Sequence, residues 1–248
     1  MRSCPRVARL VLVLAHVVHI GVLSSVVAQA PQGPEIAFSS ARAGQTEIHV
    51  MGPDGGGVRS LTQLGGYAWQ PRWAPDGRKI AFAWQKADEP WERHIYTMRA
   101  DGAQVTKLTR ERDARDSSPT WSPDGRHIAF ASKRPKVDGT HIYMMDADGR
   151  DLRRLTLDWM FERAYSGSPS WSPDGSEIAF TSRPPWEDAL EVFAVRPNSR
   201  RVRQITDDGM WNRNYSAWLA RAGMNGCPSR AFWMAARTPI SCFRAVEI

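Results

Sequence analysis

Four residues that could bind a metal recur at one position of an internal repeat. Glu47, His94, His141 and Glu191 each open a short apolar segment, and carboxylates and imidazoles are common metal ligands. In a closed ring of repeats, however, equivalent positions on middle strands stand a strand spacing or more from the axis and diverge outward. We therefore favour a structural role for these residues, and predict no metal site and no cofactor.

Known catalytic patterns do not occur in the sequence. There is no Gly-x-Ser-x-Gly elbow, no His-Glu-x-x-His, no Cys-x-x-Cys pair and no glycine-rich phosphate loop. The stretch Asp-Ala-Asp-Gly at 146–149 resembles the start of a calcium loop, but the later ligands and the closing glutamate do not follow. It predicts a turn, and we predict that the chain is not an enzyme.

A larger group of residues could bind a partner. Eleven tryptophans occur, and six of those outside the repeated motif lie in segments that we expect to be long loops, interleaved with other aromatics and arginines. Trp, Tyr and Arg often anchor interfaces, although single aromatics could equally fill gaps between sheets. The predicted ligand-binding surface comprises Trp69, Trp84, Trp91, Arg93, Arg115, Trp159, Phe161, Arg163, Tyr165, Trp186, Trp211 and Arg213.

A repeat supplies the elements that must position these residues. The stretch PTWSPDGRHIAFAS at 119–132 returns with small changes at 71–84 and 169–182, with the tryptophans 48 and 50 residues apart. A second apolar segment follows each copy, then an Asp-Gly step (Pro-Asn-Ser in the last unit) and a closing Leu-Thr or Ile-Thr. Pro-Asp-Gly and Asp-Gly predict tight turns, and the apolar segments predict strands covered on both faces.

These units have the length and turn pattern of propeller blades. Four short antiparallel strands in about 45–50 residues are typical of one blade. From Glu35 to Trp218 the motifs resemble the repeats of the TolB-like β-propeller family, with its Pro-x-Trp-Ser-Pro-Asp-Gly…Ile-Ala-Phe…Ile-Tyr…Asp-Gly…Leu-Thr pattern. We predict an all-β fold: a β-propeller of four-stranded antiparallel blades, about four in number, or a truncated form of the six-bladed type.

The sequence is compatible with two arrangements of the blades, a closed ring and an open arc. The first unit begins at its second strand, near Ile36, whereas Ser216–Trp218 looks like one more first strand. That strand could complete the opening unit and close a ring of four blades. An open arc is the rival arrangement, so we expect a monomer or a dimer of arcs.

The N-terminus has the features of a signal peptide. Three arginines precede an apolar run over 10–27, and Ala28-Gln29-Ala30 predicts cleavage after Ala30. An uncleaved anchor is less favoured, because two histidines interrupt the run. Cleavage lowers the net charge from +7 to +4, and without a basic run this makes nucleic acid a poor partner. We expect no stable membrane insertion after cleavage.

The repeat pattern breaks after Trp218. We divide the chain into a signal peptide (1–30), TolB-like propeller repeats (31–218) and a divergent tail (219–248). A frame-shifted or truncated final section and an ordinary divergent cap both remain open explanations for the tail. Cys227 and Cys242 lie there, and they could pair in an oxidising compartment.

Together these features predict an exported, non-catalytic binding or scaffold protein of the cell envelope, either periplasmic or secreted. Its partner would be an envelope protein, a peptide or a glycan, contacted through the aromatic and arginine residues of one face. The family resemblance implies this class, because its members link envelope components by protein–protein contact. The alternative is the propeller portion of a secreted hydrolase or lyase of the prolyl-oligopeptidase type, separated from its catalytic domain.

Overall fold

The structure is a computed structural model that describes residues 33–156, 164–183, 189–206, 216–220, 231–235 and 245–246, the last three ranges by their backbone. Every regular element in these ranges is a β-strand. The predicted signal peptide and cleavage site lie outside the described residues. Within them, no helix is long and apolar enough to cross a bilayer.

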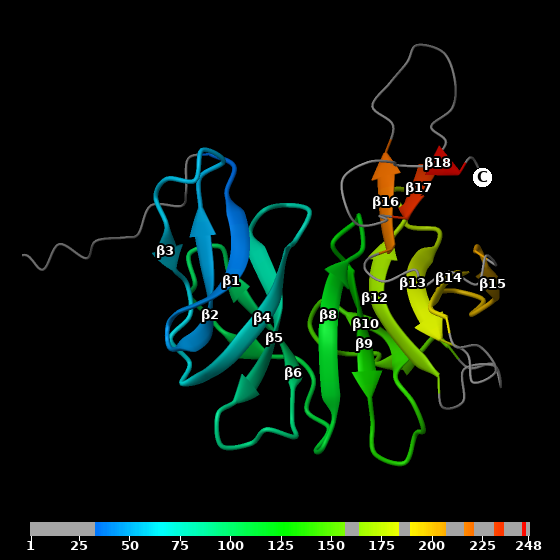
Figure 1. Ribbon diagram of the computed structural model, residues 1–248, viewed down its shortest axis with the longest axis horizontal. Coiled ribbons are helices and arrows are strands. Elements are labelled where there is room, and N and C mark those ends of the chain that lie inside the picture. Colours follow the sequence, from blue (N-terminus) through cyan, green and yellow to red (C-terminus); the bar gives the residue numbers. More distant parts are fainter. Residues whose placement is uncertain are drawn as a thin grey trace, which may run out of the picture.

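The strands form five antiparallel sheets in chain order (Figure 1). Three of the sheets have four strands, and the first and last have three. The bounds are β1 (Ile36–Ala43), β2 (Gln45–Met51) and β3 (Arg59–Ser60); β4 (Gly66–Trp73), β5 (Lys79–Lys86), β6 (His94–Arg99) and β7 (Thr106–Lys107); β8 (Arg115–Trp121), β9 (His127–Lys133), β10 (His141–Asp146) and β11 (Arg153–Arg154); β12 (Tyr165–Trp171), β13 (Ile178–Arg183), β14 (Glu191–Val195) and β15 (Val202–Gln204); and β16 (Ser216–Ala220), β17 (Ala231–Ala235) and β18 (Ala245–Val246).

This architecture confirms the predicted all-β propeller of about four blades. The sheets β4–β7, β8–β11 and β12–β15 each contain the four antiparallel strands expected of one repeat. We refer to β1–β3 as the first blade and to these three sheets as the second, third and fourth blades. The first blade has three strands because the sequence enters its first unit at the Ile-Ala-Phe strand.

The idea that the last first-type strand completes the first blade is wrong. Strand β16 pairs with β17, in a separate sheet that contacts β12 and β13, while β1 and β2 lie at the other side of the molecule (Figure 1). The segment Ala231–Ala235 offers β16 a partner close along the chain. Closing so short a loop costs less conformational entropy than joining both ends of the array.

The core is built between blades by packing large side chains on small ones. Phe130 of the third blade lies in one buried cluster with Ala83 of the second. One blade further on, Phe180 lies in the next cluster with Ala131. The bulky residues of the Ile-Ala-Phe strand in the third and fourth blades therefore face the preceding blade, and the alanines of the second and third blades face the next one. Phe130 thus fills the space between the second and third blades.

The two ends of the strands carry different connections. At one end, which we call the turn face, Pro-Asp-Gly joins the first and second strands of a blade, and Asp-Gly, or Pro-Asn-Ser in the fourth blade, joins the third and fourth. Gly125 closes such a turn: its N–H donates to the carbonyl of Ser122 over 2.9 Å, and its φ is 69°. The other end, the loop face, carries the longer segments that link β5 to β6, β9 to β10, and each blade to the next.

Candidate binding surface

Short backbone bridges between blades fix the loop face. The Arg93 N–H donates to the carbonyl of Ala114, and the Asp116 N–H donates back to the carbonyl of Arg93, both over 2.9 Å. A parallel bridge of the same kind joins Thr140 to Tyr165 one blade further on. Backbone hydrogen bonds of this kind hold the side chains at these positions in place relative to both blades.

A first arginine–aromatic pair lies over the second blade. The guanidinium of Arg93 lies 5.7 Å from the ring centre of Trp69, which itself stacks on Tyr67 at 5.6 Å with an interplanar angle of 9°. At this distance the cation is attracted to the face of the indole. Trp69 belongs to β4, so its predicted place in a loop is wrong, because β4 begins as early as Gly66.

A second pair of the same kind lies beside the first. The guanidinium of Arg115 lies 5.0 Å from the ring centre of Trp91, and its Nε donates to the Trp91 carbonyl over 3.3 Å. Trp91 is nevertheless 67% exposed, an unusual value for so large an apolar side chain. The indole is thus held by the arginine with much of its surface open to a partner.

Arg93 also lies near a third aromatic residue, Tyr165. Burial lowers the pKa of the Arg93 guanidinium, and the positive charge of Arg115 lowers it further, whereas Tyr165 and Asp116 raise it. An arginine so placed still carries its charge at neutral pH. Tyr165 is 56% exposed. The structure therefore brings together five of the predicted residues, which we call the rim cluster: Trp69, Trp91, Arg93, Arg115 and Tyr165.

A cavity of about 210 Å³ opens next to the rim cluster. Its basic wall contains Arg134, which is buried, lies 4.6 Å over the ring of Tyr143 and forms ion pairs with Glu111 and Asp116. Sequence reasoning missed this arginine, since it follows the end of a repeat strand and has no motif of its own. The cavity is lined by Trp91, Asp113, Arg115, Lys133, Arg134 and Pro135.

Trp84 has a different environment from the one predicted for it. It lies in β5 rather than in a loop, because that strand continues to Lys86. Its ring meets Tyr96 edge-on at 5.3 Å and covers Gly66, where an added Cβ would come within 3.1 Å of the indole. Trp84 thus contributes to the packing of the second blade. The remaining predicted surface residues lie outside the described part of the chain: Trp159, Phe161, Arg163, Trp186, Trp211 and Arg213.

Three of the four repeated Glu and His positions contact the threonine that closes their unit, whereas His94 lies against Glu92 and Asp116 instead. Thr62 donates its hydroxyl hydrogen to the buried carboxylate of Glu47 and accepts the Ile48 N–H over 2.9 Å. His141 meets Thr156 in the same way, with Nδ1 and Oγ1 3.1 Å apart. Among the described residues, no group of three or more His, Cys, Asp or Glu side chains is placed to hold a metal ion. The contacts of Glu47, His141 and Glu191 fasten the strands within their blades.

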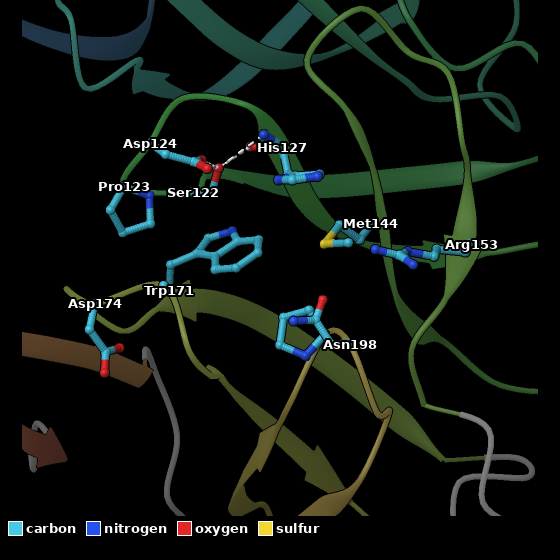
Figure 2. A pocket seen from close by; sticks show the side chains of 11 residues that line it. Ser122, Pro123, Asp124, His127, Met144, Arg153, Trp171, Asp174 and Asn198 are labelled. Atoms are coloured by element: carbon cyan, nitrogen blue, oxygen red, sulfur yellow. Dashed lines mark hydrogen bonds between the residues drawn. The ribbon is translucent and has the colours of Figure 1, made fainter.

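A second cavity, of about 270 Å³, lies on the turn face between the third and fourth blades (Figure 2). The sequence predicted only tight turns here, at Pro-Asp-Gly and Asp-Gly. The available signal was the replacement of Asp-Gly by Pro-Asn-Ser in the fourth unit. The lining residues are Ser122, Pro123, Asp124, His127, Met144, Arg153, Trp171, Asp174, Gly175, Pro197 and Asn198.

Comparison with solved structures shows similar propellers in proteins of different kinds. A putative TolB from Agrobacterium tumefaciens is 26% identical, with a TM-score of 0.59 over 72% of this chain and 63% of that one. TolB from Acinetobacter baumannii is 18% identical, with a TM-score of 0.58 over 86% of this chain and 52% of that one. A puromycin-hydrolyzing peptidase from Mycobacterium tuberculosis is 15% identical, with a TM-score of 0.60 over 88% of this chain and 35% of that one.

The chain spans 63% and 52% of the length of the two TolB structures. The likeness to the Acinetobacter TolB and to the peptidase shows the fold alone, and one fold serves many functions. The family assignment comes from the sequence, where the model of the TolB beta propeller domain matches residues 30–217. Because that match covers most of the sequence, and the blades follow its repeats, the chain belongs to the TolB β-propeller family.

Proposed function

We propose that this protein is an exported, non-catalytic binding or scaffold protein of the cell envelope, and that it contacts a protein, peptide or glycan through the rim cluster. The observation that carries the proposal is the pairing of each arginine with an indole on the same face, with Trp91 and Tyr165 left largely exposed.

The physical argument concerns the entropy of binding. A long arginine side chain that becomes ordered on binding loses rotamer freedom, which costs about 0.5–1.5 kcal/mol. Here Arg115 is already held by the ring and the carbonyl of Trp91. An ordered surface of Trp, Tyr and Arg has the composition of binding hot spots. Because both guanidinium groups of the cluster lie over aromatic rings, the cluster suits holding a partner better than transforming one.

The envelope location is part of the same proposal. It is supported by the predicted signal peptide at 1–30 and by membership of the TolB β-propeller family.

Capture from an envelope extract tests the proposal. The tagged chain would be compared with the double variant Trp91→Ala/Arg115→Ala, and with Arg150→Ala/Leu152→Ala as a matched control. Arg150 and Leu152 are exposed on the turn face and follow its Asp-Gly step. We expect the rim variant to bind the captured partner at least about tenfold more weakly, as for a hot spot, and the control to bind normally.

Two results would contradict the proposal. Equal retention by the wild type and the rim variant would remove the rim cluster as the binding surface. Turnover of a peptide or polysaccharide by the wild type would instead support the hydrolase or lyase alternative.

A further inference from the structure

Strand β1 has an open edge that its counterparts in the other blades lack. In the second, third and fourth blades the Ile-Ala-Phe strand lies between a first and a third strand of its sheet. The first blade has the order β1-β2-β3, so the corresponding strand, β1, lies at the end of its sheet. The backbone N–H and C=O groups on its other side therefore face no partner strand among the described residues.

In the complete blades the strand at this end of the sheet, β4, β8 or β12, is protected against further pairing. Each contains a proline directly after a residue with a φ of 51–55°, and its register with the second strand shifts there. These pairs are Gln70-Pro71, Ser118-Pro119 and Ser168-Pro169. Proline and a bulge both blunt an edge strand. From Ile36 to Ser40, β1 has no proline, no charge and no register shift, so it is an inner type of strand at an edge position.

The three complete blades specify what kind of strand fits this edge. In each of them the tryptophan that follows the proline by two residues lies opposite the isoleucine of the second strand. The pairs are Trp73 and Ile80, Trp121 and Ile128, and Trp171 and Ile178. These three isoleucines are fully buried, whereas Ile36 is 44% exposed. An extended segment with a Pro-x-Trp pattern would place its aromatic ring beside Ile36.

The second blade has a polar contact on the side where such a strand would pass. Between the first strands of the third and second blades, the Ser118 N–H donates to Oε1 of Gln70 over 2.7 Å. Gln70 holds the same repeat position one blade earlier, and its own N–H donates to the hydroxyl of Ser39 in β1 over 3.2 Å. Gln70 is exposed. A side chain of an added first strand would accept from Gln70 as Gln70 accepts from Ser118.

The folded chain has no spare strand of this type. Every first strand that the structure describes already pairs with its own second strand, in β4–β5, β8–β9, β12–β13 and β16–β17. Ahead of β1, the stretch Ala-Pro-Gln-Gly at 30–33 corresponds to the turn Ala-Pro-Asp-Gly at 74–77, so the first-strand position of this unit falls at 23–29. Those residues belong to the predicted signal peptide, and cleavage after Ala30 separates them from the blade.

We propose that β1 accepts an extended segment of another envelope protein, which adds antiparallel to it as the first strand of the first blade. Backbone hydrogen bonds supply the affinity, and an aromatic residue opposite Ile36, two residues after a proline, sets the register. The inference rests on the export part of the proposed function, since cleavage leaves the edge open. It does not involve the rim cluster.

Binding of a peptide copied from the third blade tests this edge. The probe is the fluorescein-labelled peptide Arg-Asp-Ser-Ser-Pro-Thr-Trp, residues 115–121, titrated into the exported chain and followed by fluorescence anisotropy. The intact mass of the same sample establishes whether the chain begins at Pro31. We expect saturable binding, with slower amide hydrogen exchange over 36–43 and unchanged exchange over 94–99 in β6.

A matched pair of variants locates the binding. Ile36→Lys places a charge on the open edge, whereas Val58→Lys places the same charge next to β3, at the opposite end of the sheet. The two side chains are similarly exposed in the wild type, at 44% and 42%. We expect Ile36→Lys to weaken the peptide at least about fivefold, and Val58→Lys to leave its affinity unchanged.

A control peptide tests the backbone pairing itself. It carries proline in place of both Asp116 and Ser117. Of two adjacent residues in a strand, one directs its N–H toward a given neighbouring strand, so this peptide loses a hydrogen bond of the ladder. We expect it not to bind. Because it is titrated into the wild type, it decides the question even if Ile36→Lys is unstable.

The failure of this inference is distinguishable from that of the export proposal. If the chain begins at Pro31 and does not bind the probe, the inference is overturned while export stands. If the chain retains residues 23–29 and does not bind, predicted cleavage and inference both fail. Binding that the two lysine variants weaken equally, or that the proline peptide reproduces, would reject the β1 edge as the site.

Discussion

The indole N–H of Trp121 donates to the carbonyl oxygen of Arg72 over 3.1 Å and so ties the third blade to the second. Trp171 holds the equivalent place one blade further on, but its Nε1 has no hydrogen-bond partner. The repeated tryptophan therefore packs between the second and third blades and between the third and fourth. It forms a hydrogen bond across the first of these interfaces only. This difference between two copies of one motif can be measured.

We expect Trp121→Phe to lower the free energy of unfolding by about 1 kcal/mol more than Trp171→Phe does. Both changes remove part of an aromatic ring, whereas only the first removes a hydrogen bond and leaves a carbonyl without its partner. Urea unfolding of the two variants beside the wild type measures the difference. Equal losses would mean that the Trp121 hydrogen bond adds nothing to the blade interface.

The threonine that closes each repeat should contribute most to stability where its hydroxyl group donates to a carboxylate. Thr62→Val removes the hydroxyl group that donates to the buried Glu47 and accepts from Ile48. We expect it to cost about 1–3 kcal/mol, since a buried charged group loses its donor. Thr62→Ser keeps the hydroxyl group and should recover most of this loss. Unfolding midpoints that are the same for the valine and serine variants would contradict this role.

The glycines of the short turns should differ according to what they touch. Gly149→Ala introduces a Cβ both at a φ of 91° and at 3.0 Å from the Leu108 carbonyl. Gly77→Ala meets a positive φ of 68° as well, but has no atom within 4 Å. We expect Gly149→Ala to lower the free energy of unfolding by at least about 1 kcal/mol more than Gly77→Ala does. Both variants strain the backbone, but only Gly149→Ala also forces two blades apart. A comparison of thermal or urea unfolding checks this, and an equal effect of both would show that backbone strain alone is responsible.

The stability of the protein should decrease as the pH falls, partly because His141 takes up a proton more readily in the unfolded chain. Burial lowers the pKa of its imidazole from 6.5, as does the charge of Arg154, and the contacts with Asp138 and Thr156 oppose this shift. The unfolded chain therefore binds the proton at higher pH than the folded protein. The contribution to stability is complete above the unfolded pKa and is lost as pH falls toward the folded one.

Urea unfolding between about pH 8 and about pH 5 measures this contribution. We expect the midpoint of His141→Gln to depend less steeply on pH than that of the wild type. A variant with a profile parallel to that of the wild type would exclude His141 as the titrating group.

The fold could be predicted from the sequence because its determinants are local and repeated. Pro-Asp-Gly fixes a turn wherever it occurs, and the Ile-Ala-Phe alternation fixes which side of a strand is bulky. The environment of Trp84 could not be predicted in this way, since it depends on how far β5 extends and on Gly66 in the neighbouring strand. The place of β16 depends on which partner strand lies nearer along the chain, which the repeat pattern does not encode.

The binding surface was predictable in composition but not in arrangement. The sequence shows many Trp and Arg residues between the repeats, and the structure adds that Arg93 and Arg115 each cover an indole. Arg134 had no sequence signal, because its contacts come from two strands of the third blade and from the segment that precedes that blade. The turn-face cavity did have a sequence signal, the missing Asp-Gly of the fourth unit. That signal can be interpreted only from the contact between Gly149 and Leu108 in the preceding interface.

Site-specific crosslinking measures the role of the rim cluster most directly. A photoreactive phenylalanine analogue would replace Trp91 in one variant and Arg150 in another, and each would be illuminated in an envelope extract. Both positions are exposed, and they lie on opposite faces of the blades. We predict a discrete crosslinked partner from position 91 and none from position 150. The same partner from position 150, with none from position 91, would contradict the proposal that the protein binds through its rim cluster.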